Sequence, residues 1–316
     1  MSFVDAINAA DLRIRPVVRE TWLEYSPALS DLLGGEVSVK LENLQHTGSF
    51  KLRGATNKIL SLGAASAQTK VITASSGNHG AAVAYALHGV GGQGLIFVPK
   101  GASAAKIANI RSLGAEVEFF GHDSAETEAH ARAYADQHGY LYVPPYNDPD
   151  VVAGQGTVAV ELLRQAARID NVFVSVGGGG LIGGIAGYLK AVSPGTRIIG
   201  CSPVNSCVMA RSVEAGRILD LESLDTLSDG TAGGIEADSM TFPLCRDLVD
   251  HWVDVSEEEI AEAMRQFIDS HHMLLEGAAG VALAGARKAG PAWTSGRTVI
   301  LICGANISRS VLGSVL

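Results

Sequence analysis

Short runs of β-branched residues alternate along this chain with longer alanine-rich stretches that have helical spacing. Neighbouring parallel strands need a crossover connection, usually a helix, so the alternation predicts an α/β fold with parallel strands. The predicted strands are 37–41, 71–74, 94–98, 117–120, 141–143, 172–176, 197–201 and 298–303. The predicted helices are 50–62, 79–88, 104–113, 124–138, 152–167, 182–191, 257–270 and 277–289.

Regular strand–helix units between about residues 70 and 145 form one continuous run, which ends in a proline-rich turn at 144–149. This run predicts a smaller domain, 70–146, inserted into a larger discontinuous domain of 1–69 and 147–316. A chain of 316 residues is long enough for two domains. A cleft between them would unite segments that lie before and after the insertion.

Charge and cysteine usage exclude several classes of partner. The net charge is −9, and no segment clusters Lys and Arg as nucleic-acid binding requires. No apolar run reaches the length of a membrane span, and the first residues lack the basic and apolar blocks of a secretory signal. The four cysteines show no CxxC spacing. We therefore expect a cytoplasmic protein that binds neither nucleic acid nor membrane.

Lys51 lies in the segment Gly-Ser-Phe-Lys-Leu-Arg-Gly-Ala at 48–55, between an aromatic residue and a helix start rich in small residues. A lysine that opens an amphipathic helix is usually a solvated surface charge. A lysine amine that loses its charge can instead hold an aldehyde cofactor as a Schiff base. Three other segments favour the second interpretation.

Four consecutive glycines at 177–180 follow a predicted strand and precede a predicted helix. Without Cβ atoms, their backbone amides can converge on a phosphate at the helix N-terminus, although a tight turn alone would also explain them. Gly178, Gly180 and Gly183 also satisfy the dinucleotide pattern GxGxxG. The next strand ends without the acidic residue that would bind a ribose, so a nicotinamide cofactor is disfavoured.

The loop Ser-Ser-Gly-Asn-His-Gly at 75–80 follows another predicted strand and opens a helix. Hydroxyl and amide groups at a helix N-terminus suit a carboxylate, although Ser75 or Asn78 could simply cap the helix. The last predicted strand ends at Cys303, whose neutral thiol could face a ring nitrogen or could only fill the core.

Together and in this order, the four segments resemble the serine/threonine dehydratase family of fold-type II pyridoxal-5′-phosphate enzymes, and the resemblance runs almost end to end. It implies two open, mostly parallel sheets flanked by helices, with pyridoxal 5′-phosphate in the interdomain cleft. Lys51 would be the Schiff-base lysine and the base that removes the Cα proton. The other residues expected to bind the cofactor are Phe50, Asn78, Gly177, Gly178, Gly179, Gly180, Leu181 and Cys303. Those expected around the substrate are Ser75, Ser76, Gly77, Asn78 and His79.

The resemblance implies an ammonia-lyase that converts a β-hydroxy-α-amino acid, such as L-threonine or L-serine, into a 2-oxo acid and ammonia by α,β-elimination. A neutral Cys303 favours elimination over transamination. Ser76 could reprotonate Cα, so a racemase or β-replacement enzyme on the same scaffold is an alternative, and a non-catalytic cofactor-binding protein is another. Family members usually form dimers, so a homodimer is expected.

The chain also departs from its family. Ser202 and Val208 stand where metal-dependent members carry acidic residues, so we expect no metal requirement. Gly233 stands where related enzymes often have a serine close to the substrate, which leaves room for a larger β-substituent. Its segment, 227–236, also resembles hydroxyectoine-utilisation and phenylserine dehydratases. The preferred hydroxyamino acid stays open. Glu276 could act near the cofactor or only stabilise a helix N-terminus.

Overall fold

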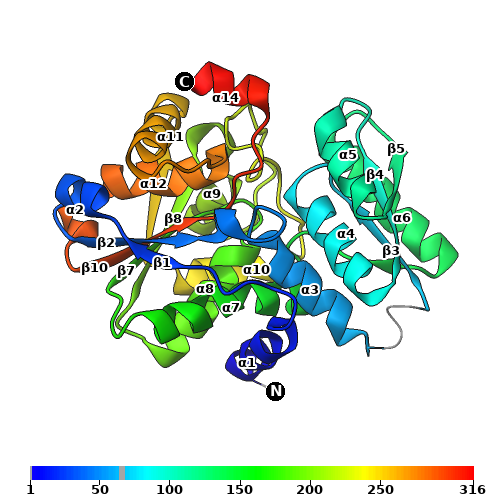
Figure 1. Cartoon of the computed structure of the whole chain (residues 1–316), viewed down its shortest axis with the longest axis horizontal. Coiled ribbons are helices and arrows are strands. Elements are labelled where there is room, and N and C mark those ends of the chain that lie inside the picture. Colours follow the sequence, from blue (N-terminus) through cyan, green and yellow to red (C-terminus); the bar gives the residue numbers. More distant parts are fainter. Residues whose placement is uncertain (1, 64–67) are drawn as a thin grey trace.

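The computed structural model describes residues 2–63 and 68–316 and contains two sheets, which lie side by side with helices around each (Figure 1). The six-stranded sheet has the order β1-β2-β10-β7-β8-β9, and the four-stranded sheet has the order β5-β4-β3-β6. Every neighbouring pair is parallel except β1 and β2. The predicted fold class, two open and mostly parallel sheets flanked by helices, is therefore confirmed.

The six-stranded sheet consists of β1 (Leu23–Tyr25), β2 (Glu36–Leu41), β7 (Asn171–Ser175), β8 (Arg197–Pro203), β9 (His251–Val255) and β10 (Arg297–Ile302). The helices that accompany it are α1 (Phe3–Ile14), α2 (Pro27–Leu33), α3 (Lys51–Ser61), α7 (Pro149–Gln165), α8 (Gly180–Val192), α9 (Val208–Ala215), α10 (Thr241–Leu248), α11 (Glu257–His271), α12 (Gly277–Ala289), α13 (Pro291–Thr294) and α14 (Arg309–Val315). Its central strands read as continuous apolar runs because helices cover both faces of the sheet.

The four-stranded sheet consists of β3 (Lys70–Ala74), β4 (Gln93–Val98), β5 (Glu116–Phe119) and β6 (Leu141–Tyr142). Helices α4 (Asn78–Val90), α5 (Ala104–Ser112) and α6 (Ser124–His138) connect its strands. Its strands all fall within the predicted insertion, 70–146. Helix α3 packs against α4 of the four-stranded sheet and against α7 of the six-stranded sheet, and so connects the two parts of the molecule. The domain boundaries themselves stay a prediction.

Several elements were not predicted, most of them short. Helix α1 carries a capping box between Ser2 and Asp5 that was visible in the sequence, whereas β1 and β9 are short edge strands with weak patterns. Helices α2, α9, α10, α13 and α14 were also missed; the longest of them has eight residues. Such short helices depend on tertiary packing for their stability.

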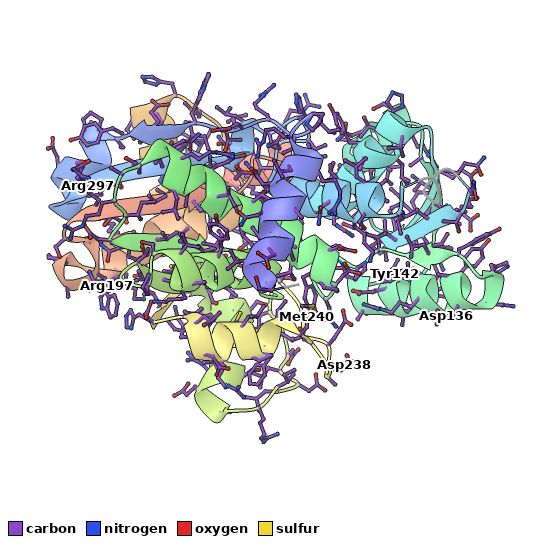
Figure 2. All side chains as sticks on the ribbon, turned by 90° about the horizontal axis from the view of Figure 1, so that it is seen from below. Asp136, Tyr142, Arg197, Asp238, Met240 and Arg297 are labelled. Carbon is purple, nitrogen blue, oxygen red and sulfur yellow. The ribbon has the colours of Figure 1, made fainter. Side chains whose placement is uncertain are left out.

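The loops after β3, β7 and β10 line one cavity. Both sheets therefore present the carboxyl ends of these strands to the same region of the molecule. The segment that carries Asp238 and Met240 hangs below the six-stranded sheet on the side turned toward β6, where Tyr142 lies (Figure 2). Within the described part of the chain, no helix combines the length and apolarity needed to cross a membrane.

Candidate active site

A cavity of about 670 Å³ lies between the two sheets. It is lined by the first turn of α3, by the loops after β3 and β7, and by the residues that follow β10. The structure brings every predicted site residue to its wall: Phe50, Lys51, Ser75, Ser76, Gly77, Asn78, His79, Gly177, Gly178, Gly179, Gly180, Leu181 and Cys303. The four motifs therefore converge in one place, as predicted.

Backbone pairing brings Lys51 and Cys303 together. The chain just before α3 pairs with the chain just after β10, through a bridge between Ser49 and Gly304. The Phe50 amide donates to the Cys303 carbonyl at 3.0 Å, and the Ala305 amide donates to the Gly48 carbonyl at 2.9 Å. The first residue of α3 is consequently held at the carboxyl end of the central strand β10.

The Lys51 amine faces this cavity, so its interpretation as a solvated surface charge is wrong. Its Nζ donates to the Pro145 carbonyl at 2.8 Å and lies 5.3 Å from the centre of the Phe50 ring. Removal from water lowers the pKa of Lys51 to about 8, although the carboxylates of Glu128 and Glu276 partly oppose this shift. A substantial fraction of the amine is therefore uncharged in mildly alkaline solution and able to act as a nucleophile or base.

The glycine run forms a compact cradle at the start of α8. Gly179 has a φ of 82°, in the left-handed region that favours glycine. A Cβ atom at Gly178 would lie 2.5 Å from the ring of Tyr146, and one at Gly177 would lie 2.8 Å from the Thr231 carbonyl oxygen. The first amides of α8 have no intrahelical acceptors, so the cradle fits a phosphate group.

Asn78 is held on both sides by neighbouring polar groups. Its Nδ2 donates to both carboxylate oxygens of Glu276, at 2.8 and 3.0 Å. Its Oδ1 accepts a hydrogen bond from Asn306 Nδ2, and the Asn306 amide donates to Glu276 at 3.0 Å. Glu276 therefore contacts a predicted cofactor-binding residue directly, and burial raises its pKa to about 7.

We expect Glu276 to make stability depend on pH. Its folded-state pKa is raised above the ordinary value of 4.5, so the stability that its proton supplies is fully present below pH 4.5 and is lost as pH rises through about 7. A shift of this size corresponds to about 3 kcal/mol. Urea unfolding of the apoprotein at pH 5, 7 and 9 should show this decline.

The Glu276→Gln variant should lack most of the decline, because its amide does not ionise. Glu258→Gln changes an exposed glutamate on α11 and should keep it. An unchanged pH dependence in Glu276→Gln would contradict the assignment.

The loop at 75–79 also differs from a simple helix cap. Gly77 is the N-cap of α4, and no described residue caps that helix through its side chain, so the interpretation of Ser75 or Asn78 as a side-chain cap is wrong. Ser75 Oγ instead accepts from the Gly77 amide at 3.2 Å. The helix amides stay available to a carboxylate in the cavity.

His79 contributes a neutral ring. Its Nε2 lies 3.0 Å from the Val143 carbonyl, an acceptor, so this nitrogen carries the proton. Burial, with the charge of Lys51, lowers the pKa of His79 to about 3. Nδ1 has no hydrogen-bond partner among the described residues. The ring therefore adds no positive charge for the substrate carboxylate that it was expected to surround.

Cys303 is 1% exposed, and its Sγ accepts a hydrogen bond from Ser175 Oγ at 3.5 Å. Burial, together with nearby Glu276, raises the pKa of this thiol well above its usual range. The cavity therefore meets a neutral thiol at the end of β10, as the sequence predicted.

Charged residues at the cavity were not predicted from the sequence. Lys106 on α5 pairs with Asp229 at 2.9 Å, and Arg132 on α6 pairs with Glu236 at 2.7 Å. Both pairs connect helices of the four-stranded sheet with the segment 229–236. Charges on amphipathic helices usually indicate a solvated face, so no local signal could identify these pairs.

Two of the three positions that depart from the family, Gly233 and Ser202, have defined surroundings in the structure. Gly233 lines the cavity with a φ of 122°, and a Cβ there would meet no described atom within 4 Å. This position therefore supplies an unusual backbone conformation as well as space. Ser202 is fully buried in β8, and its Oγ has no partner in residues 2–63 and 68–316. Those residues contain no group of three or more His, Cys, Asp or Glu side chains that could hold a metal ion.

A lysine amine of lowered pKa, a glycine cradle for phosphate and a neutral thiol meet in a single cleft between the two mostly parallel-stranded sheets. This donor set defines an enzyme that holds a phosphorylated aldehyde cofactor. Residues 14–304 match the family model described as "Pyridoxal-phosphate dependent enzyme". The chain belongs to this family, and its cofactor is pyridoxal 5′-phosphate.

Named relatives cover almost the whole chain. An L-threonine ammonia-lyase from Thermotoga maritima is 37% identical over 317 residues, which is 100% of this chain and 78% of that protein. The processed form of threonine deaminase isoform 2 from Solanum lycopersicum superposes with a TM-score of 0.94 at 36% identity, covering 99% of this chain and 86% of the other. Maize serine racemase has a TM-score of 0.92 at 32% identity, covering 99% and 96%.

Proposed function

We propose that this enzyme is a dehydratase that converts a β-hydroxy-α-amino acid of the L-threonine or L-serine type into a 2-oxo acid and ammonia. One observation carries the proposal: the Lys51 amine, with its lowered pKa, shares a cavity with a neutral thiol at the end of β10 and with the loop at 75–79. The names of the relatives support the same activity.

The residues present fit the cofactor. Lys51 would hold its aldehyde, the amides of 177–181 its phosphate, Asn78 its ring oxygen, and Cys303 its ring nitrogen, with Phe50 packed against the ring. When bound, pyridoxal 5′-phosphate supplies a conjugated ring that withdraws electrons from the Cα of the substrate.

The chain's own groups would bind the substrate and move one proton. The N-terminus of α4, with Ser75, Ser76 and Gly77, binds the substrate carboxylate. Lys51 Nζ accepts the proton from Cα, and the hydroxyl at Cβ leaves with the electron pair of its C–O bond. The enamine that leaves the site hydrolyses in water to the 2-oxo acid and ammonia.

Cys303 favours elimination over longer-lived carbanion chemistry. A carboxylate at this position would stabilise a proton on the ring nitrogen, whereas a neutral thiol does not. Negative charge at Cα is then less stabilised, and prompt loss of the β-hydroxyl competes better. This argument separates a dehydratase from a transaminase on the same scaffold.

Racemisation is a second candidate activity because Ser76 lines the same cavity as Lys51. Among the residues described, the Ser76 side chain has no hydrogen-bond partner, so its hydroxyl is available to donate a proton to Cα. The similarity to maize serine racemase supports keeping this activity in view.

A substrate panel tests the proposal. We expect the holoenzyme to release 2-oxo acid from at least one of serine, threonine, threo-3-hydroxyaspartate and phenylserine, at least tenfold faster than it inverts Cα. The open space at Gly233 suits substituents larger than methyl. Coupled keto-acid assays and chiral chromatography of the same samples give both rates. Inversion without keto-acid release would replace the dehydratase by a racemase, and the absence of both would favour a non-catalytic role.

We further propose that the protein is a cytoplasmic homodimer. Each copy would consist of a larger domain, 1–69 and 147–316, and a smaller domain, 70–146. Free thiols at all four cysteines support a reducing compartment. Tyr25 in the edge strand β1 and Trp22 just before it are 54% and 67% exposed, which suits contact with a second copy. Sedimentation equilibrium of the holoenzyme tests the dimer.

A further inference from the structure

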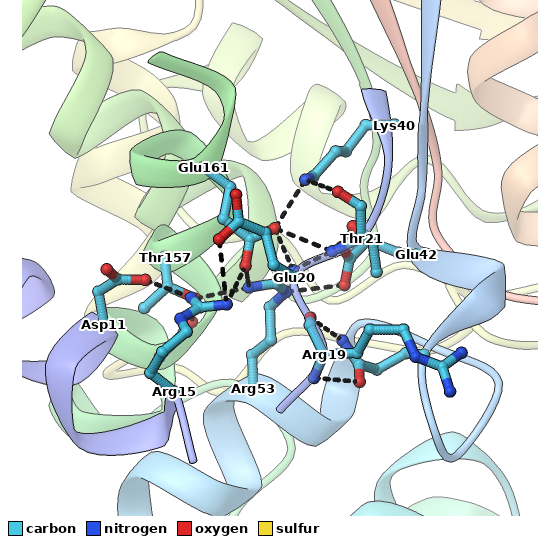
Figure 3. Close-up of polar contacts among 12 residues, drawn as sticks. Asp11, Arg15, Arg19, Glu20, Thr21, Lys40, Glu42, Arg53, Thr157 and Glu161 are labelled. Carbon is cyan, nitrogen blue, oxygen red and sulfur yellow. Dashed lines mark hydrogen bonds and ion pairs between the residues drawn. The ribbon is translucent and has the colours of Figure 1, made fainter. Parts of the chain in front are cut away.

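A network of charges lies behind the first turn of α3, and its central members, Lys40, Glu42, Arg53 and Glu161, are fully buried (Figure 3). Arg53 of α3 binds two carboxylates, Glu42 in the short helix η1 (Glu42–Leu44) and Glu161 in α7. Lys40 of β2 binds Glu161 at 2.6 Å, and Arg15 binds the same carboxylate at 2.9 Å. The network thus joins α3 to four other segments: β2, η1, α7 and the end of α1.

Arg53 uses its whole hydrogen-bonding capacity. Its Nε and Nη2 donate to the two oxygens of Glu42, both at 2.8 Å. Its Nη1 and Nη2 donate to the two oxygens of Glu161, both at 2.7 Å, and Nη1 also donates to Thr157 Oγ1 at 3.1 Å. A guanidinium has five donors in one rigid plane, so this arrangement permits a single orientation of the group.

Stability alone does not explain such a network. Each buried charge loses several kcal/mol of hydration, and apolar residues of similar volume often serve a core equally well. The planar guanidinium of Arg53 with its five donors, which we call the fork, fixes a geometry that an apolar core would not. Close to it, Gly54 and Gly154 let the backbones of α3 and α7 approach, since a Cβ at Gly154 would lie 2.6 Å from the Cα of Gly54.

Helix geometry relates Arg53 to Lys51. The two residues are separated by two positions, which is about 200° around a helix, so they project from opposite sides of α3. A guanidinium fixed behind the helix directs Lys51 toward the cavity in front. Backbone pairing at Ser49 and Phe50 fixes where the helix begins, while no described side chain caps that end.

We propose that Arg53 is a positioning residue: its fork, held by Glu42 and Glu161, sets the rotation of the first turn of α3 and so places Lys51 Nζ in the cavity. The inference rests on the proposed role of Lys51. Arg53 is fully buried and does not line the cavity, so it would act only through the helix that it shares with Lys51.

The Arg53→Lys variant tests this inference because it keeps the charge but removes the fork. In the holoenzyme, kcat should fall about 10- to 100-fold while KM changes less than threefold, since a displacement of about 1 Å is costly for the proton transfer and not for carboxylate binding. In the apoprotein, pH-dependent acetylation of Lys51, followed by mass spectrometry, should report a pKa above about 8, because a misplaced amine is better hydrated.

The matched control is Lys58→Met, which removes an ion pair between α3 and Asp148 at 2.7 Å without touching the fork. It should leave kcat and the Lys51 labelling profile unchanged. If Arg53→Lys lowers the melting temperature but changes neither of these, Arg53 is merely structural and the inference is wrong.

Two milder variants decide the matter if Arg53→Lys does not fold. Glu42→Gln and Thr157→Val each remove part of the fork's support. Each should lower kcat about two- to tenfold and leave KM nearly unchanged. Normal kcat and labelling in both would overturn the inference. A different result would contradict the proposed function itself: retention of 2-oxo acid release by Lys51→Ala.

Discussion

Replacing Lys51 by alanine is expected to reduce the release of 2-oxo acid by about 10³-fold or more, since proton transfer by a positioned group contributes about 10²- to 10⁴-fold and the cofactor also loses its tether. The amine that is lost is the group whose pKa the site lowers to about 8. The visible absorbance of the bound cofactor should shift to that of the free aldehyde. Steady-state assays and absorbance spectra of the reconstituted protein measure both effects.

Lys58→Ala is the matched control for Lys51→Ala. Lys58 lies on the same helix, about two turns further along, and pairs with Asp148 and Asp150 outside the cavity lining. Its variant should retain near-normal activity and spectrum. If Lys51→Ala retained both as well, the central claim of the proposed function would be lost.

Gly178→Ala should weaken the binding of pyridoxal 5′-phosphate by about 10- to 150-fold, which corresponds to the loss of one hydrogen bond to a charged group, about 1.5–3 kcal/mol. The added Cβ would lie 2.5 Å from the Tyr146 ring. That ring is not free to move away, because its hydroxyl accepts a hydrogen bond from the Glu236 amide at 3.0 Å. The loop must shift instead, and its amides lose their convergence on the phosphate.

Fluorescence titration of the apoprotein with cofactor measures this change in affinity. Gly195→Ala, in an exposed turn where a Cβ would meet no described atom within 4 Å, is the control and should bind normally. Circular dichroism melts show whether each apoprotein is folded. A folded Gly178→Ala protein with unchanged affinity would exclude the cradle as the phosphate site.

The sequence predicted the parts of the site whose residues lie in short contiguous segments. Lys51, the loop at 75–79, the glycines at 177–180 and Cys303 each stand at the end of a strand or the start of a helix. Parallel strands present their carboxyl ends to one edge of a sheet, so residues far apart in the chain can be expected to meet there. The roles of these residues remain predictions, whereas their convergence on one cavity is observed.

Other features depend on partners that no local pattern identifies. Arg53 and Glu161 are separated by more than a hundred positions, and neither segment indicates that its charge is buried. Arg132 belongs to a helix whose charges are typical of a solvated face, yet it pairs with Glu236 at the cavity. The edge strand β9 has no clear apolar pattern, because polar His251 and Asp254 interrupt its five residues, and three of the five are only partly buried.

The position of β10 has a consequence for the order of assembly. Of the described strands this one comes last in the sequence, yet it lies inside the larger sheet, between β2 and β7. During synthesis, the four-stranded sheet can form once residue 142 has left the ribosome, whereas the larger sheet stays open until residue 302 emerges. The reactive lysine, made early, is therefore completed as a functional group only after Cys303 has emerged.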